Sequence, residues 1–296
     1  MSRTEFECEN TFRRMGQVYN ANTPENHPIV LKTEQDFKAA MSILAVCAGM
    51  YPDVKVYAFQ LMSNHIHLVA ASSEAQIQEF FEFFVTRLDK FFAHTMDFSS
   101  FKLKLFPVSD LSYLRNAIAY VNRNGFVVNN DVTPFSYQWG SSRYFFQPVV
   151  RRYEEKCSRT IGIAALRALI HSRFCDHLKD LRSIDGYISP LEFCHIEEAE
   201  SIFRDAKQYF YTISRNIEAN SEVAKSIGES IFYTDSDLYS AASKMAKENF
   251  CNYNLKTLPA DAKLEIAKRL HYDYNAGDKQ LNRLLGIDMM ILKALF

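Results

Sequence analysis

Two histidines, and further along the chain a tyrosine and an asparagine, have the residue types and the spacing of a reactive site. His65 and His67 flank Ile66 in a run typical of a β-strand. Because side chains alternate between the two faces of a strand, both imidazoles are expected on one face while Ile66 enters the core. Such a pair can bind a metal ion, although two histidines at this spacing more often form only a polar strand face.

Tyr120 and Asn124 lie four residues apart, and so on one face of a helix that is predicted from about Leu111 to Arg123. They continue a polar stripe that begins at Tyr113 and Asn116. Such a stripe is usually only solvated, and any one of the 16 tyrosines is usually a packing residue. A tyrosine hydroxyl is nevertheless a competent nucleophile toward phosphorus when a metal ion neutralises and positions the phosphate. The two pairs of residues therefore make sense together as one site.

The elements that would position these residues alternate between strands and helices. The predicted strands are Val54–Leu61, His65–Ala70 and Phe101–Val108, the first two joined by a tight antiparallel connection at Met62-Ser63-Asn64. Apolar residues at helical spacing predict helices over Thr33–Met50 and Ser73–Phe92. Ser109 or Asp110 can cap the helix that carries Tyr120.

With one further strand before the helix that starts at Thr33, the order of elements in residues 1–150 is strand, helix, strand, strand, helix, strand, helix. This order predicts an α+β domain with a ferredoxin-like antiparallel sheet and helices on one face. After Arg151 the strand signals fade, and an all-helical C-terminal region is expected. Within residues 151–257 the predicted helices are 159–181, 190–214, 222–228 and 238–250.

The last segment, residues 258–296, has the pattern of a helix-turn-helix module. A helix over Asp261–Leu270 is followed by a turn around Asn275-Ala276-Gly277 and by a helix over Asp278–Leu285. Gly286 then precedes a final helix that runs to Phe296. Short helices joined by turns that contain glycine are typical of such modules.

Three sequence blocks together resemble a known family. They are Phe59–Val69 (FQLMSNHIHLV), Tyr120–Asn124 (YVNRN) and Tyr137–Tyr144 (YQWGSSRY). In this order they are similar to the single-tyrosine HUH transposases, and most of all to the REP-associated tyrosine transposases. The resemblance covers about residues 12–146; Ser63 and Gly125 stand where the family commonly has proline.

The resemblance implies a metal-dependent endonuclease and strand transferase that acts on single-stranded DNA near a hairpin. Such an enzyme becomes joined to its DNA through a 5′-phosphotyrosine, and the released 3′-hydroxyl can reverse the reaction. By position, His65 and His67 match the paired metal ligands of the catalytic centre, Tyr120 the nucleophile and Asn124 a residue that completes the metal site. Imidazole with a carboxamide oxygen suits Mn²⁺ or Mg²⁺.

Basic and aromatic side chains elsewhere are candidate DNA contacts. Lys102 and Lys104 lie two residues apart on a predicted strand, and Lys279 and Arg283 lie four apart on the candidate recognition helix, where a protein contact is the alternative. Trp139 can either stack on an unpaired base or close the edge of the core. The remaining candidates share only a guanidinium group: Arg123, Arg143, Arg151 and Arg152.

Composition places few limits on this interpretation. The chain has 296 residues and a formal net charge of -1, which counts mildly against nucleic-acid binding, although local basic patches can still bind a backbone. No membrane segment is expected, because the apolar stretch Ala39–Met50 is too short. The acidic first ten residues do not resemble a secretory signal, so the expected location is the cytoplasm.

The six cysteines show no repeated spacing and are expected to be reduced thiols. Cys175, His177, Cys194 and His195 lack the paired Cys-x₂₋₄-Cys spacing of a structural zinc site, and we do not assign one.

Two other interpretations stay open at this point. A domesticated DNA-binding or regulatory protein would keep the fold without cleavage, and the weak overall basicity favours it. A replication initiator or relaxase would share the chemistry, but the chain has no phosphate loop of the helicase type. A homodimer is possible for any of these proteins.

Overall fold

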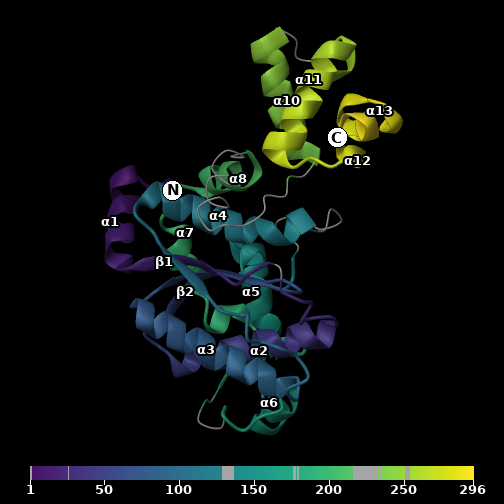
Figure 1. Cartoon of the computed structure of the whole chain (residues 1–296). Helices are drawn as coiled ribbons and strands as arrows, with labels where there is room; N and C mark the ends of the chain where they lie inside the picture. The colour runs from purple at the N-terminus through teal and green to yellow at the C-terminus, as the bar shows by residue number, and fades with distance from the viewer. Residues whose placement is uncertain are drawn as a thin grey trace. The chain divides into compact units, whose positions relative to one another are not determined.

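The structure is a computed structural model that describes residues 2–25, 27–128, 137–175, 178, 180–215, 233, 235–250 and 254–296, with no side chains described at 125–128, 214–215 and 236 (Figure 1). The chain divides into two compact units. The first unit comprises Met1–Phe126 and Asp131–Ile213, and the second comprises Val127–Asn130 and Ser214–Phe296.

A four-stranded antiparallel sheet forms the centre of the first unit. Its strands are β1 (Val18–Asn22), β2 (Lys55–Leu61), β3 (Ile66–Ala71) and β4 (Lys104–Pro107), in the spatial order β2-β3-β1-β4. Helix α2 (Glu34–Met50) connects β1 to β2, and α3 (Glu74–Phe91) connects β3 to β4. The α+β class is confirmed, and the elements follow the predicted order; β4 begins three residues later than expected.

Local capping explains where the helices of this unit begin. The Thr33 side chain accepts from the Asp36 amide while Asp36 accepts from the Thr33 amide, so α2 starts with a complete capping box. Ser73 caps α3 by accepting from the Gln76 amide, without the reciprocal half of a capping box. Asp110, the predicted cap, accepts from Tyr113 N at 2.9 Å and begins α4 (Leu111–Val128).

Helices cover both faces of the sheet. Figure 1 shows α2 and α3 on one side and α4 on the other. Side chains alternate along β3, so Leu68 and His67 point in opposite directions, and it is His67 that contacts α4. The expectation that helices lie on one face only is therefore wrong, because Tyr120 and Asn124 of α4 contact His67 on the face of the sheet opposite α2 and α3.

The first unit continues well past residue 150. Helix α1 (Glu5–Met15) precedes β1, and the later elements are α5 (Pro148–Cys157), β5 (Arg159–Thr160), α6 (Ile163–Ile170), β6 (Arg182–Ile184), β7 (Tyr187–Ile188), α7 (Ile196–Glu200) and α8 (Ala206–Arg215), with 3-10 turns at Ser142–Tyr144 and Pro190–Glu192. Leu166, Tyr187 and Tyr209 belong to the same buried core as the sheet. Residues beyond 150 thus complete this core.

The prediction of an all-helical region after residue 150 is wrong, since β5, β6 and β7 form a second antiparallel sheet. Ile184 pairs with Tyr187 across Asp185 and Gly186, whose φ angles are 49° and 86°. A two-residue Asp-Gly loop with both φ values positive is the preferred hairpin turn. The sequence signal was present, but the strands are too short for the alternation of polar and apolar residues to show. The predicted helix at 222–228 lies outside the described residues.

The second unit has its own buried core. It contains α10 (Asp235–Phe250), a 3-10 turn at Leu255–Thr257, α11 (Ala260–Tyr274), α12 (Asp278–Leu285) and α13 (Met289–Leu295). Asn275 and Gly286, with φ of 54° and 66°, end α11 and α12 in the left-handed conformation. The three predicted helices of this segment are confirmed. Among the described helices, none combines the length and apolar content that crossing a bilayer requires.

Candidate active site

Strand pairing places four polar residues in one row across the central sheet. Asn22 of β1 pairs with His67 of β3 and with Lys104 of β4, and His67 also pairs with Gln60 of β2. Residues directly opposite one another in antiparallel strands point to the same face. The row Gln60, His67, Asn22 and Lys104 therefore lies on the face that α4 covers.

Asn124 contacts His67 across this interface. Its Nδ2 lies 2.5 Å from Nε2 of His67 and donates to it. Since Nε2 accepts this hydrogen bond, the imidazole carries its proton on Nδ1 and has its lone pair on Nε2. This is the tautomer in which Nε2 can bind a metal ion.

His65 is held in the same tautomer by a different residue. Its Nδ1 donates to Oδ1 of Asn64 at 2.8 Å, and Asn64 in turn donates to the Glu25 carbonyl oxygen. A hydrogen bond of this kind to the second ring nitrogen is what orients histidines that bind metals. The rings of His65 and His67 are nearly perpendicular, with centroids 4.8 Å apart.

Burial keeps both imidazoles neutral. Burial lowers the pKa of His67 to about 3. Burial also lowers the pKa of His65 to about 3, with a further contribution from the neighbouring His67. At neutral pH both histidines are therefore in the unprotonated state that metal binding requires.

Tyr120 lies beside the histidines. Its ring centroid is 5.8 Å from that of His67, with the two planes at 82°. Only 7% of the Tyr120 residue is exposed, and His67 is fully buried. The predicted nucleophile and the predicted ligands therefore lie close together within one chain, at the interface between α4 and the sheet.

The third sequence block fixes α4 to the sheet. Ser141 Oγ donates to Asn122 Oδ1 at 2.7 Å and accepts from Phe59 N at 3.0 Å. Tyr137 donates through its hydroxyl to the Leu61 carbonyl oxygen at 2.7 Å. A Cβ added to Gly140 would lie 2.9 Å from the Phe59 carbonyl oxygen, so a glycine is needed at this close approach. The three blocks that carry the family resemblance therefore meet along β2 and β3.

The donor set fits a hard or borderline divalent cation. Two neutral imidazoles and one carboxamide converge. Imidazole nitrogen suits transition-metal ions better than Mg²⁺, which prefers oxygen ligands, and three protein ligands would leave positions open for phosphate oxygens. Neighbouring ligands of an octahedral ion lie roughly 3 Å apart, given bonds of about 2.1 Å. Asn124 approaches His67 Nε2 through its amide nitrogen, so its oxygen would have to face the ion for both residues to bind it. Within the described ranges, no group of three or more His, Cys, Asp or Glu residues could hold a metal.

Of the predicted DNA contacts in the first unit, three are exposed and four are not. Lys102, Lys104 and Arg152 are exposed. Arg151 pairs with Glu200, and Arg143 lies 3.7 Å from the buried Glu154, so both guanidinium groups already have carboxylate partners. Half of the six charged contacts predicted in this unit are therefore exposed.

The other two residues of that set are packed into the protein. Arg123 is only 4% exposed. Trp139 stacks on Phe37 with centroids 5.1 Å apart and meets the edge of Tyr187 at 5.7 Å. Trp139 therefore closes the edge of the core, as the simpler of the two interpretations expected.

In the second unit the two predicted contacts differ. Lys279 is exposed on α12. Arg283 makes a bidentate pair with Asp235 of α10, at 2.7 and 2.9 Å. Gln280 of the same helix also bonds to Asp235 and to the Tyr233 carbonyl oxygen. This face of α12 is therefore used largely within the unit.

Asn22, Gln60 and Asn64 are site residues that were not singled out from the sequence. Asn64 and Gln60 stand inside the block around the histidines, so their position was a signal. No sequence signal pointed to Asn22, because only the pairing of β1 with β3 brings it next to His67. Comparison of the chain with protein-family models, with curated proteins and with solved structures found no match.

Proposed function

We propose that this chain is a metal-dependent single-stranded DNA endonuclease and strand transferase of the HUH single-tyrosine kind. The observation that carries the proposal is the convergence of His65, His67, Asn124 and Tyr120 at one interface. The strand order and the β-α-β-β-α-β connections of the central sheet match the ferredoxin-like arrangement of that family.

In this proposal His65, His67 and Asn124 hold a Mg²⁺ or Mn²⁺ ion. When bound, the ion neutralises charge on the scissile phosphate and orients it for in-line attack. Asn64 keeps Nε2 of His65 aimed at the site by accepting from its Nδ1. The Asn124 amide turns its oxygen toward the ion in place of its nitrogen.

Tyr120 is the proposed nucleophile. Its phenolic oxygen forms a bond to phosphorus, and the bond from phosphorus to the 3′-oxygen breaks. The phenol loses its proton, and the leaving 3′-oxygen gains one to become the 3′-hydroxyl. The product is a 5′-phosphotyrosine. Because one phosphodiester is exchanged for another, the same groups can catalyse the return reaction, in which the 3′-hydroxyl attacks the phosphotyrosine.

Lys104 is the favoured contact to the DNA backbone near this centre. It is exposed, and it lies two strands from His67 in the same row, which places the two Cα atoms about 10 Å apart at ordinary strand spacing. A lysine there can hold the phosphate that neighbours the scissile one. For the second unit we propose a contact with duplex DNA through Lys279, the exposed basic residue of α12.

The experiment is to incubate the protein with labelled single strands that carry a hairpin, in the presence of Mn²⁺, and to look for a covalent protein–DNA band. The band should need the metal and should be absent in Tyr120→Phe. Tyr113→Phe, on the same helix stripe, is the matched control and should still form it. An adduct that persists in Tyr120→Phe means that the nucleophile is another residue.

A second candidate function is favoured by the burial of the centre. His67 is fully buried and Tyr120 is 7% exposed, so DNA reaches them only if α4 moves. A domesticated DNA-binding protein on this fold needs no such movement. Specific hairpin binding without any adduct, over a range of metals and sequences, would favour this second function over cleavage.

A further inference from the structure

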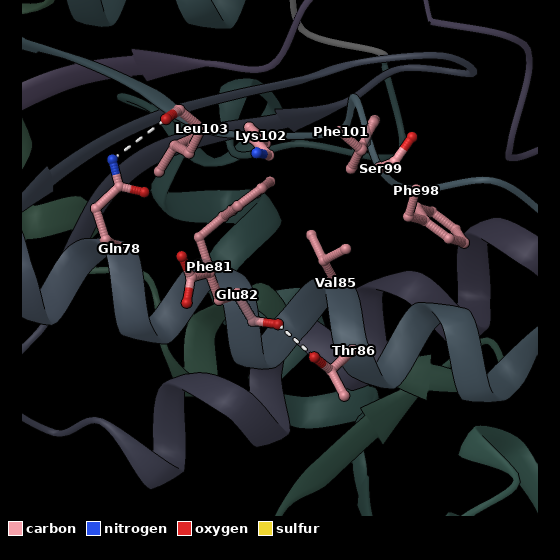
Figure 2. Close-up of a pocket in the computed structure, with 10 residues that line it drawn as sticks. All are labelled: Gln78, Phe81, Glu82, Val85, Thr86, Phe98, Ser99, Phe101, Lys102 and Leu103. Atoms are coloured by element: carbon pink, nitrogen blue, oxygen red, sulfur yellow. Dashed lines mark hydrogen bonds between the residues drawn. The ribbon is translucent and has the colours of Figure 1, made fainter.

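A slot lies between α3 and the segment that leads into β4. Its volume is about 550 Å³, within the range of about 300 to 1,000 Å³ that small-molecule pockets occupy. Figure 2 shows one wall formed by α3 side chains and the other by residues 98–103. The proposed catalytic chemistry does not use this slot.

Aromatic rings line the inside of the slot. Phe81 and Phe101 are buried and stack with centroids 6.1 Å apart, and Phe98 meets Phe101 edge to face at 5.7 Å. Of these three rings only Phe98 is partly exposed, so it is the one on which a flat heteroaromatic ring can stack. Stacking on a protein aromatic contributes about 1 to 3 kcal/mol per nucleobase. The slot therefore suits a planar ligand.

The wall that carries Phe98 and Phe101 is tied in place. His27 lies behind it, with Nε2 2.9 Å from the Asp97 carbonyl oxygen and Nδ1 2.8 Å from that of Pro28. The His27 ring also meets the edge of Phe101, with centroids 4.9 Å apart. The slot is thus already formed without a ligand, which reduces the ordering cost of binding.

Two opposite charges stand at the mouth of the slot. Glu82 projects from α3 and Lys102 from the facing segment, and both are exposed (Figure 2). Within the described part of the chain, neither side chain forms an ion pair or a hydrogen bond. A carboxylate accepts from exocyclic amino groups, and an ammonium group binds phosphate. One ligand that offers a flat ring, an amino group and a phosphate is a nucleotide.

We propose that the slot holds one unpaired nucleotide of the DNA strand, with a base that carries an exocyclic amino group in preference to thymine. The base stacks on the partly exposed Phe98, its amino group donates to Glu82, and its phosphate binds Lys102. This inference rests on the proposed function, because Lys104, two residues further along, belongs to the polar row that contains His67. Because α3 and α4 lie on opposite faces of the sheet, the DNA strand would pass around the edge strand β4 to reach the slot.

The test measures binding separately from cleavage by using the Tyr120→Phe protein. Fluorescence anisotropy compares labelled oligo(dC) with oligo(dT) of equal length, and we expect dC to bind roughly fivefold more tightly, the effect of one net hydrogen bond. Glu82→Gln should reduce this preference to less than about twofold while leaving dT binding unchanged. Glu79→Gln, an exposed neighbour outside the slot, is the matched control and should behave like the parent.

Lys102→Gln tests the proposed phosphate contact independently of the base preference. It should weaken dC and dT binding equally and reduce the salt dependence of the binding constant by about one phosphate contact. The exposed Lys90→Gln is its control. Equal binding of dC and dT by the parent, or the same loss in Glu79→Gln as in Glu82→Gln, overturns the proposal. Binding of free dCMP as tightly as the oligonucleotide assigns the slot to a free nucleotide and overturns its role on a strand.

The experiments distinguish a failure of the proposed cleavage activity from a failure of the proposed nucleotide binding in the slot. If the protein with Tyr120 forms no covalent adduct while the dC preference and its loss in Glu82→Gln remain, the slot is supported and only strand cleavage is lost. If the adduct forms but the preference is absent, the slot proposal is wrong and the catalytic proposal stands.

Discussion

Asn124 of α4 lies with its side-chain amide 2.5 Å from Nε2 of His67 on β3. One residue comes from a helix and the other from the sheet that the helix covers, and 57 residues separate them in the chain. This contact selects the His67 tautomer and lies where the proposed function places a cation.

Replacement of Asn124 should weaken metal binding more than folding. In Asn124→Ala, the Mn²⁺ affinity should fall by about tenfold or more, because one donor of the proposed set is lost. Asn124→Asp should keep or raise the affinity, since a carboxylate oxygen replaces the amide oxygen. Titration calorimetry with Mn²⁺ measures both, and Asn116→Ala, two turns earlier on the same helix, is the control. An unchanged affinity in Asn124→Ala would remove Asn124 from the proposed site.

Asn64 should act on the metal through His65. Its Oδ1 accepts from His65 Nδ1 at 2.8 Å, so Asn64→Ala frees the ring to rotate and to change tautomer. We expect a loss in Mn²⁺ affinity of roughly ten- to a hundredfold, the usual effect of removing an outer-shell partner. Asn64→Asp, which still accepts from Nδ1, should restore most of it. If Asn64→Ala and Asn64→Asp lose affinity equally, the hydrogen bond is not the cause.

The metal-free protein should lose stability as the pH falls from about 6.5 toward 3. In the folded state the pKa values of His65 and His67 are each about 3, whereas an unfolded histidine has a pKa near 6.5. Between these values the unfolded state binds protons that the folded state does not, so acid favours unfolding. At pH 5 the effect is on the order of 2 kcal/mol for each histidine.

Urea unfolding at pH 7 and pH 5, with a chelator present, measures this loss. His67→Gln should show a smaller difference between the two pH values than the parent protein. Replacement of the exposed His171 by Gln is the control and should leave the difference unchanged. If His67→Gln loses as much stability as the parent protein between pH 7 and pH 5, the acid sensitivity has another source.

Gly140→Ala should destabilise the first unit. The added Cβ meets the Phe59 carbonyl oxygen at 2.9 Å, and overpacking of this kind typically costs about 1 to 3 kcal/mol. Gly162→Ala, where no atom lies within 4 Å of the new Cβ, is the matched control. Thermal unfolding monitored by circular dichroism distinguishes the two. Equal melting temperatures for both variants would mean that the segment around Gly140 moves away from β2 at little cost.

The local parts of this molecule were predictable from the sequence. Thr33, Ser73 and Asp110 cap helices because each accepts a hydrogen bond from an amide only a few residues away. The shared face of His65 and His67 follows from the period of a strand, and that of Tyr120 and Asn124 from the period of a helix. These relationships depend on backbone geometry over a few residues.

Tertiary structure decided which of these faces meet and which charges stay available. Asn22 and Lys104 join the row of His67 only through the pairing of three strands, and Arg143 and Arg151 are withdrawn from solvent by Glu154 and Glu200. Strand register and ion pairs both depend on residues that are far apart in the chain. They are set when the chain folds, because buried polar and charged groups need hydrogen-bonding or ionic partners. No short stretch of sequence contains both members of such a pair, so only the folded chain reveals them.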